Sequence, residues 1–255
     1  MSSEAFGRLG LVTGFEIGRA VHSWRLPVCI AATVLLLLAS LQSALGDTGD
    51  SEYFLYPMTS SVILIVSILA AVTSAENVSD EFERGTGYVM LTQPVSRYTL
   101  FAGKFLSAYS VCALLLTVYY AVIAVLSMSL CGDVTGRLAT SFGLALLYLF
   151  AAIGVCNLIG CLAPSGSVSL VVSLVLLVVV QLFMVNVGFD SEPWFSLSYS
   201  ASSVSDCILG IQTVFDGSMN TTDYQPLLST ATCIMALYGT ASTALSAVLF
   251  RYRSI

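Results

Sequence analysis

The side chains best suited to specific chemistry gather in one segment, Glu76–Lys104, which lies between two long apolar runs. This segment carries the carboxylates of Glu81 and Glu83 and the guanidinium groups of Arg84 and Arg97. Side chains of these types form ion pairs and charge-assisted hydrogen bonds with a partner surface. These residue types therefore indicate that the segment binds a partner surface.

Glycine and proline divide this segment into short helical pieces. Asp80 and Arg84 are four residues apart, which favours a helix that continues from the preceding apolar run. Gly85 ends that helix, Thr86 can cap a new short helix, and Pro94 ends the second one. The sequence thus predicts a short helix that is held apart from the apolar runs on either side.

The short helix, over Gly87–Thr92, exposes apolar side chains that include Tyr88 and Leu91. Apolar surface is unfavourable in water, so the helix needs a protein partner. We therefore predict that a second protein docks on this segment.

The rest of the sequence is that of an integral membrane protein. Hydrophobic residues make up 57% of the 255 residues and charged residues only 9%, whereas soluble domains average roughly 25% charged residues. Runs of about 20 apolar residues cross ~30 Å of hydrocarbon as a helix. We predict an all-α fold with six such spans in a single domain, residues 1–255. The predicted spans are Leu26–Leu45, Met58–Ala75, Phe105–Met128, Leu138–Ala163, Val168–Phe189 and Leu227–Phe250.

The basic residues orient these spans. Of nine Lys and Arg residues, only Arg137 falls on the side opposite to the N-terminus. The positive-inside rule therefore places both termini, and the docking segment over residues 76–104, in the cytoplasm. The expected location is the cell membrane. The basic residues on the cytoplasmic side are Arg8, Arg19, Arg25, Arg84, Arg97, Lys104, Arg251 and Arg253.

Residues 1–25 are predicted to form an interfacial amphipathic helix. Trp24 shares one helical line with Ile17 and Val21, and Glu16 and Arg19 lie on another line. A helix of this kind lies in the membrane interface, with Trp24 at the depth of the lipid headgroups.

The external segment over residues 190–226 is predicted to hold a further short amphipathic helix. Ser203 can cap it, and the helix is expected on the outer membrane surface or dipping into it. Its apolar stripe, spaced 4, 3 and 4 residues apart, is Val204, Ile208, Ile211 and Phe215.

The predicted spans contain no Asp, Glu, Lys, Arg or His. Ion-coupled carriers and proton relays need ionisable groups at membrane depth, and neither a metal site nor a catalytic site is expected. Asn157 and Gln181 lie within the spans. Such polar groups most simply form hydrogen bonds between helices; the alternative is that they line a substrate path.

The pattern E-x-E-R-G-T-x-x-x-x-L-x-x-P-V-S-R-x-x-x-x-x-G-K, read from Glu81 to Lys104, resembles the hallmark of ABC exporter permeases of the type-2 family. In that family the segment is the coupling helix, which sits in a groove of the ATP-hydrolysing subunit. The six spans, the interfacial helix and the external helix are also similar to that family. Among its branches, the chain most resembles the one grouped with nitrous-oxide-reductase maturation permeases.

The resemblance implies a permease subunit that couples ATP hydrolysis by a separate ABC ATPase to substrate movement. The sequence has no GxxxxGK[ST] loop to cradle ATP phosphates, so the chain itself is expected to be no enzyme and to bind no cofactor. ATP and Mg²⁺ are expected on the partner. The other implied partners are a second copy of the chain and the lipid bilayer, with no nucleic acid. The residues implied in ATPase coupling are Glu81, Glu83, Arg84, Gly85, Thr86, Tyr88, Leu91, Pro94 and Arg97.

Two alternatives to a transporter subunit remain open from the sequence. The chain could be a membrane anchor that recruits an ATPase for signalling or envelope remodelling without transport. A secondary carrier fits less well because the spans lack charged residues. The apolar spans favour a hydrophobic or bulky neutral substrate.

Overall fold

The computed structural model describes residues 3–45, 51–75, 97–179, 196–209 and 228–252. Within these ranges the chain is helical, without a strand, as the sequence predicts. The helices are α1 (Ser3–His22), α2 (Arg25–Ala44), α3 (Ser51–Ala70), α6 (Arg97–Leu130), α7 (Arg137–Leu162), α8 (Gly166–Leu174), α10 (Leu197–Leu209) and α11 (Leu228–Tyr252), with π-helical turns η1 (Ala71–Ala75) after α3 and η2 (Val175–Val179) after α8.

Among the described residues, five helices are long and apolar enough to cross a membrane. They are α2, α3 with most of η1, α6, α7 and α11, and each contains most or all of one predicted span. The predicted span Val168–Phe189 is helical only from Gly166 to Val179 in the described part, which is shorter than a span. Its remainder lies outside the described residues, so the sixth span stays a prediction.

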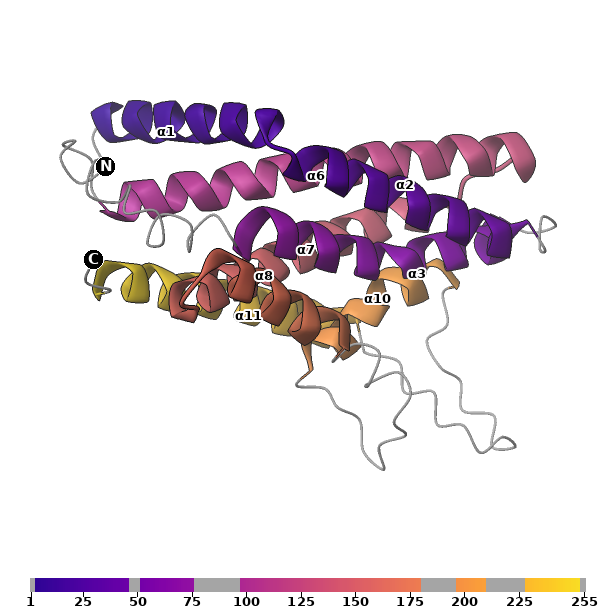
Figure 1. Ribbon diagram of the computed structural model, residues 1–255. Helices are drawn as coiled ribbons and strands as arrows, with labels where there is room; N and C mark the ends of the chain where they lie inside the picture. The colour runs from indigo at the N-terminus through magenta and orange to yellow at the C-terminus, as the bar shows by residue number, and fades with distance from the viewer. Residues whose placement is uncertain (1–2, 46–50, 76–96, 180–195, 210–227, 253–255) are drawn as a thin grey trace.

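The spanning helices form a bundle around α3 (Figure 1). α3 packs against α2, α6, α7 and α10, and α7 packs against α11. Large side chains of α3, among them Phe54, Leu55 and Met58, are completely buried. Apolar burial of this kind is supplemented in a membrane by close packing and by hydrogen bonds between helices.

Tyrosine and serine side chains supply such hydrogen bonds in the core. The hydroxyl groups of Ser67 on α3 and Tyr148 on α7 are 3.0 Å apart. Tyr120 on α6 lies 2.9 Å from Ser141 on α7, and Ser141 donates to the carbonyl of Val204 on α10 over 2.6 Å. These contacts connect α3, α6, α7 and α10 through neutral groups.

The external helix begins earlier than predicted. α10 begins at Leu197, so Ser203 is an internal residue whose hydroxyl donates to the Ser200 carbonyl and does not cap the helix. Val204 and Ile208 are completely buried, because α10 packs among α3, α7 and α11. Its position relative to the membrane stays a prediction. Ile211 and Phe215 lie outside the described residues.

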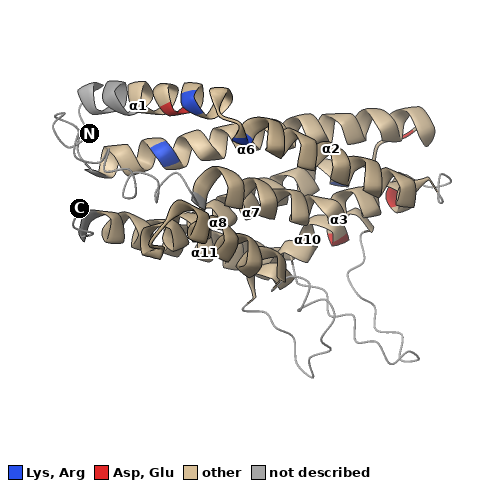
Figure 2. Cartoon of the chain, viewed as in Figure 1, with Lys and Arg blue, Asp and Glu red and all other residues tan. Residues whose placement is uncertain are grey.

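Among the described residues, the charged side chains lie on α1, near the start of α6, on α10 and towards the ends of the spanning helices (Figure 2). α1 begins, α6 begins and α11 ends at the same end of the bundle (Figure 1). α6 has 34 residues and is therefore about 51 Å long, well beyond the ~30 Å of a hydrocarbon core. Part of α6 therefore extends beyond the length that a span needs, and α1 packs against this helix.

Candidate functional site

The predicted docking segment falls between two elements that the structure describes, η1 and α6. Its own residues at 76–96 lie outside the described residues, and Arg97 is the first residue of α6. The structure therefore shows how the two ends of the segment are held. The predicted coupling residues that lie outside the described part are Glu81, Glu83, Arg84, Gly85, Thr86, Tyr88, Leu91 and Pro94.

The upstream end is η1, which is fixed to two neighbouring helices. Ser74 donates to the carbonyl of Ile153 on α7 over 3.3 Å. The hydroxyl of Thr73 lies 3.1 Å from the sulfur of Cys112 on α6. π-Helical turns within a helix are frequent at functional sites. Here the turn lies immediately before the docking segment, so η1 and the start of α6 are the two elements joined directly to that segment.

The downstream end is the first part of α6, which packs closely against α1. A Cβ atom placed on Gly103 would lie 2.6 Å from Cγ1 of Val12. Real side chains do not approach so closely, so glycine at position 103 is what allows α1 to lie against α6.

The next residue of α6, Lys104, forms a buried ion pair with α1. Its Nζ lies 3.6 Å from Oε1 of Glu16, and the two side chains are only 2% and 7% exposed. A buried charge is stable only when it is paired, because burial removes its hydration. Gly103 and Lys104 together hold the helix that follows the docking segment against α1.

This contact corrects the sequence-based view of Glu16. Glu16 was expected on the polar line of an interfacial helix, but it faces α6 because Lys104 provides its counter-charge. The sequence does contain residues that could indicate the contact. Lys104 follows Gly103 directly before the third predicted span, and Glu16 offers a carboxylate in the N-terminal helix. The pairing of the two could not be deduced from their spacing.

The opposite face of α1 is apolar and exposed. Leu11 and Phe15 are 77% and 67% exposed, and Trp24 after the helix is 79% exposed. Val21 is half exposed and Ile17 is partly buried. Exposed apolar surface marks contact with lipid or with another protein. That α1 lies in the membrane interface remains a prediction.

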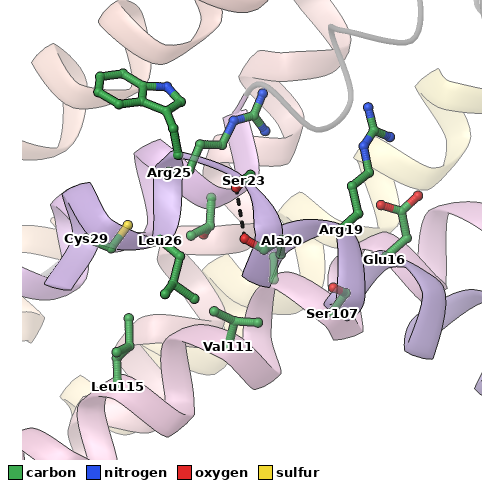
Figure 3. Close-up of a pocket in the computed structure, with 13 residues that line it drawn as sticks. Glu16, Arg19, Ala20, Ser23, Arg25, Leu26, Cys29, Ser107, Val111 and Leu115 are labelled. Carbon is green, nitrogen blue, oxygen red and sulfur yellow. Dashed lines mark hydrogen bonds between the residues drawn. The ribbon is translucent and has the colours of Figure 1, made fainter.

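A cavity of about 260 Å³ opens where α1 meets α2 and both face α6. Arg19 and Arg25 extend to one side of this elbow, whereas Leu26 and Val111 lie on the other side (Figure 3). The cavity therefore has a basic end and an apolar end. Its lining also includes Thr73 of η1, which places the cavity next to the upstream end of the docking segment.

Of the two residues predicted for a substrate path, the structure describes only Asn157. Gln181 lies outside the described residues. Asn157 is on α7 and is 3% exposed, and its Nδ2 makes no hydrogen bond within the described part of the chain. The expected hydrogen bond between helices is thus not seen for this nitrogen.

Replacement of Asn157 by leucine is expected to leave the protein at least as stable as before. An unpaired buried amide costs roughly 1–3 kcal/mol, and leucine has a similar size without that cost. Thermal unfolding of the purified protein in detergent measures the effect, with Ser141→Ala as the control that breaks a buried hydrogen bond. A clear loss of stability in Asn157→Leu would show that the amide has a partner, and a loss of transport alone would indicate a substrate path.

Comparison with known proteins gives one family assignment. Residues 16–254 match the model of the family described as ABC-2 family transporter protein. No curated protein matches the chain. The matched range begins at Glu16, and it contains the docking segment, Gly103, Lys104 and all five candidate spans.

Proposed function

The chain belongs to the ABC-2 family of transporter proteins and is a multi-pass permease component of an ABC transporter, and we propose that it is an exporter subunit driven by a separate ATPase. Permeases of this family normally work with an ABC ATPase. In this proposal the ATPase binds ATP and Mg²⁺, and the permease chain carries no catalytic residue, metal or cofactor. The proposed location is the cell membrane, with both termini in the cytoplasm.

The proposed coupling contact is the segment at residues 76–96. Tyr88, Leu91 and Pro94 would fill a groove of the ATPase, while Glu81, Glu83, Arg84 and Arg97 would anchor the segment by ion pairs. Gly85 and Thr86 would set the start of the short helix. The observation that carries this proposal is the way in which both ends of the segment are fixed to the bundle.

These fixed ends support a route for mechanical coupling. Upstream, η1 is hydrogen-bonded to α7 and contacts α6. Downstream, α6 is held to α1 by the Glu16–Lys104 pair. Closure of the ATPase on ATP would move the segment, and packed helices transmit such movement because tightly packed cores deform little. The segment would thereby shift α3 and α6 together.

A second copy of the chain is proposed to complete the transporter, with one ATPase beneath each copy. The branch of nitrous-oxide-reductase maturation permeases is the proposed subfamily. The uncharged spans support a hydrophobic or bulky neutral substrate, which would cross the membrane or leave it laterally.

Replacement of Tyr88 and Leu91 by aspartate is expected to abolish co-purification with the ATPase. Two carboxylates would have to be buried unpaired in an apolar groove, which costs several kcal/mol. The measurement is the ATPase-to-permease ratio after affinity purification of the complex. The matched control, Tyr88→Phe with Leu91→Met, keeps both side chains apolar and should retain the complex.

An unchanged complex in the aspartate variant would contradict the coupling assignment. Hydrolysis that no candidate substrate stimulates, in a complex that stays intact, would favour the alternative of a membrane anchor that recruits an ATPase without transport.

A further inference from the structure

Asn157 lies at a polar junction within the otherwise apolar bundle, where α7 meets α11 on one side and η1 and α8 on the other. We propose that this junction binds a neutral hydrogen-bond acceptor, such as a carbonyl oxygen, on an otherwise hydrophobic substrate, and that the Asn157 amide donates to it. This proposal rests on the proposed function as a transporter subunit, for which it names the substrate class and a residue that selects it.

One side of the junction is formed by α11. Asn157 is three residues after Gly154 and four residues before Cys161, so the three residues share one face of α7. Both of these neighbours contact α11. A Cβ atom on Gly154 would meet the hydroxyl of Ser242, and the Cys161 thiol donates to the carbonyl of Ser246 over 3.6 Å. Asn157 therefore lies on the face towards α11, at the level of two buried serines.

The other side of the junction is formed by η1 and α8, which pack against each other and against α7. The Ser74 hydroxyl of η1 donates to the carbonyl of Ile153 over 3.3 Å, and this carbonyl belongs to the helical turn that ends at Asn157. Ser173 of α8 lies beside Cys156, the residue before Asn157. Both serines are completely buried. The position of Asn157 is thus bordered by serines from three elements.

The Asn157 amide is the donor at this junction that has no acceptor. Its Nδ2 is buried and makes no hydrogen bond within the described part of the chain. The hydroxyls of Ser74, Ser242 and Ser246 already donate to backbone carbonyls, and Ser173 lies beside a thiol, which is a weak partner. Buried polar groups in native proteins are nearly always paired, and exceptions are expected at functional sites. An acceptor on a ligand would supply the missing partner.

The residues around Asn157 favour a neutral acceptor over a charged one. A side-chain amide nitrogen offers two N–H donors, so the complementary ligand atom is an oxygen with free lone pairs. A charged group at membrane depth is costly without a counter-charge, and the residues that border Asn157 are all neutral. A carbonyl, ether or hydroxyl oxygen accepts a hydrogen bond without this cost.

The junction lies near the end of the bundle from which the docking segment extends. Asn157 is five residues before the end of α7 at Leu162, which is about 7.5 Å along a helix. α6 and α7 are joined by a short turn, so α7 ends on the side where α6 begins. Through Ser74, the turn that ends at Asn157 is hydrogen-bonded to η1. A ligand at Asn157 would therefore act on the element that precedes the docking segment.

Benzophenone with an isotope-labelled carbonyl is the probe for this site, because it is bulky, hydrophobic and neutral and has one acceptor oxygen. Infrared difference spectroscopy of the purified full-length protein in detergent reports a hydrogen bond to the probe as a carbonyl band at lower frequency. We expect this band to saturate with probe concentration in the parent protein. In Asn157→Leu the band should be lost, and binding should weaken about tenfold, the upper end of the net effect of one neutral hydrogen bond.

Matched variants and a second compound separate the hydrogen bond from hydrophobic binding. Asn157→Gln keeps the amide and should keep the lowered band. Thr240→Val removes a hydroxyl from the exposed side of α11 and should bind the probe as the parent does. Diphenylmethane has a similar size but no carbonyl, so it should displace the probe about tenfold less well than unlabelled benzophenone. Ser74→Ala should keep the band, and in the complex with the ATPase it should reduce the stimulation of ATP hydrolysis by benzophenone.

Three results would overturn the proposal. One is the absence of a saturable lowered band in the parent protein. Another is the same band in Asn157→Leu, and the third is displacement by diphenylmethane as efficient as by benzophenone. Because these measurements use the permease alone, they do not depend on an ATPase. A complex that fails to form, with the band behaving as expected, would refute the coupling to an ATPase and leave the site intact.

Discussion

Replacement of Lys104 by methionine is expected to destabilise the protein by about 3–5 kcal/mol, the usual cost of leaving one member of a buried ion pair without its partner. The Glu16 side chain is 7% exposed and that of Lys104 is 2% exposed, so water has little access to the carboxylate that loses its ammonium partner. Thermal unfolding of the purified protein in detergent measures the change. Loss of α1 packing, detected as faster protease cleavage within residues 3–22, should accompany it.

Three control variants separate the buried pair from a general effect of charge. Exchange of the two residues, Glu16→Lys with Lys104→Glu, should recover much of the lost stability because the pair is restored. Double replacement by methionine should be nearly neutral, as for other buried pairs replaced by apolar residues. Arg137→Met breaks the pair with Glu52 at 3.0 Å, whose side chains are 47% and 38% exposed, and should cost less than about 1 kcal/mol.

Equal effects of Lys104→Met and Arg137→Met would mean that α1 is not held to α6 by this pair. If the pair does hold α1, the complex of Lys104→Met with an ATPase should still form, because Tyr88 and Leu91 are unchanged. Its substrate-stimulated ATP hydrolysis should fall, since the downstream end of the docking segment would no longer be fixed.

The spanning helices could be predicted because the information is local. A run of about 20 apolar residues is sufficient to identify a helix of membrane length, and α2, α6, α7 and α11 each contain almost all of such a predicted run. The helix over the third predicted span is longer than the span itself. α6 is already helical at Arg97, eight positions before Phe105, which agrees with the expectation that one helix carries Arg97 and Lys104 into the span.

The partners of each helix could not be predicted, because they depend on packing between distant parts of the chain. The stripe that contains Val204 and Ile208 indicated a helix with one apolar face. It did not show that α3, α7 and α11 cover that face. Likewise, the sequence placed Glu16 on a polar line, and only the approach of α1 at Gly103 shows why that side chain is buried.

The π-helical turns were missed for a different reason. The backbone hydrogen bonds of a π-helix span five residues, one more than in an α-helix. The sequence AVTSA contains no glycine or proline that would indicate such a turn. Its hydrogen bonds to α7 and its contact with α6, through Ser74 and Thr73, exist only in the packed bundle. The predicted span Met58–Ala75 was therefore expected as a regular helix throughout, whereas its last described turn is π-helical.

Replacement of Gly154 by leucine is expected to destabilise the protein by about 3 kcal/mol, at the upper end of the usual cost of overpacking. Gly154 of α7 faces α11, where a Cβ atom would lie 3.1 Å from Cγ2 of Thr243 and 3.2 Å from the carbonyl oxygen of Gly239. It would approach the hydroxyl of Ser242 even more closely. Because a backbone atom is among the obstacles, the two helices would have to separate. Thermal unfolding in detergent again measures the effect.

Two glycines of the same helix pair make the test specific. Gly143 on α7 has nothing within 4 Å of its Cβ position, so Gly143→Leu should be neutral or slightly stabilising, since glycine is a poor helix former. Gly239→Ala on α11 meets chiefly the ring of Phe150, a side chain that can rotate, and should cost less than Gly154→Leu. Equal stabilities of Gly154→Leu and Gly143→Leu would show that α7 and α11 can move apart freely. If Gly154→Leu is the least stable variant and Gly143→Leu the most stable, α7 and α11 are tightly packed against each other. A movement that η1 imposes on α7 would then be transmitted to α11 as well.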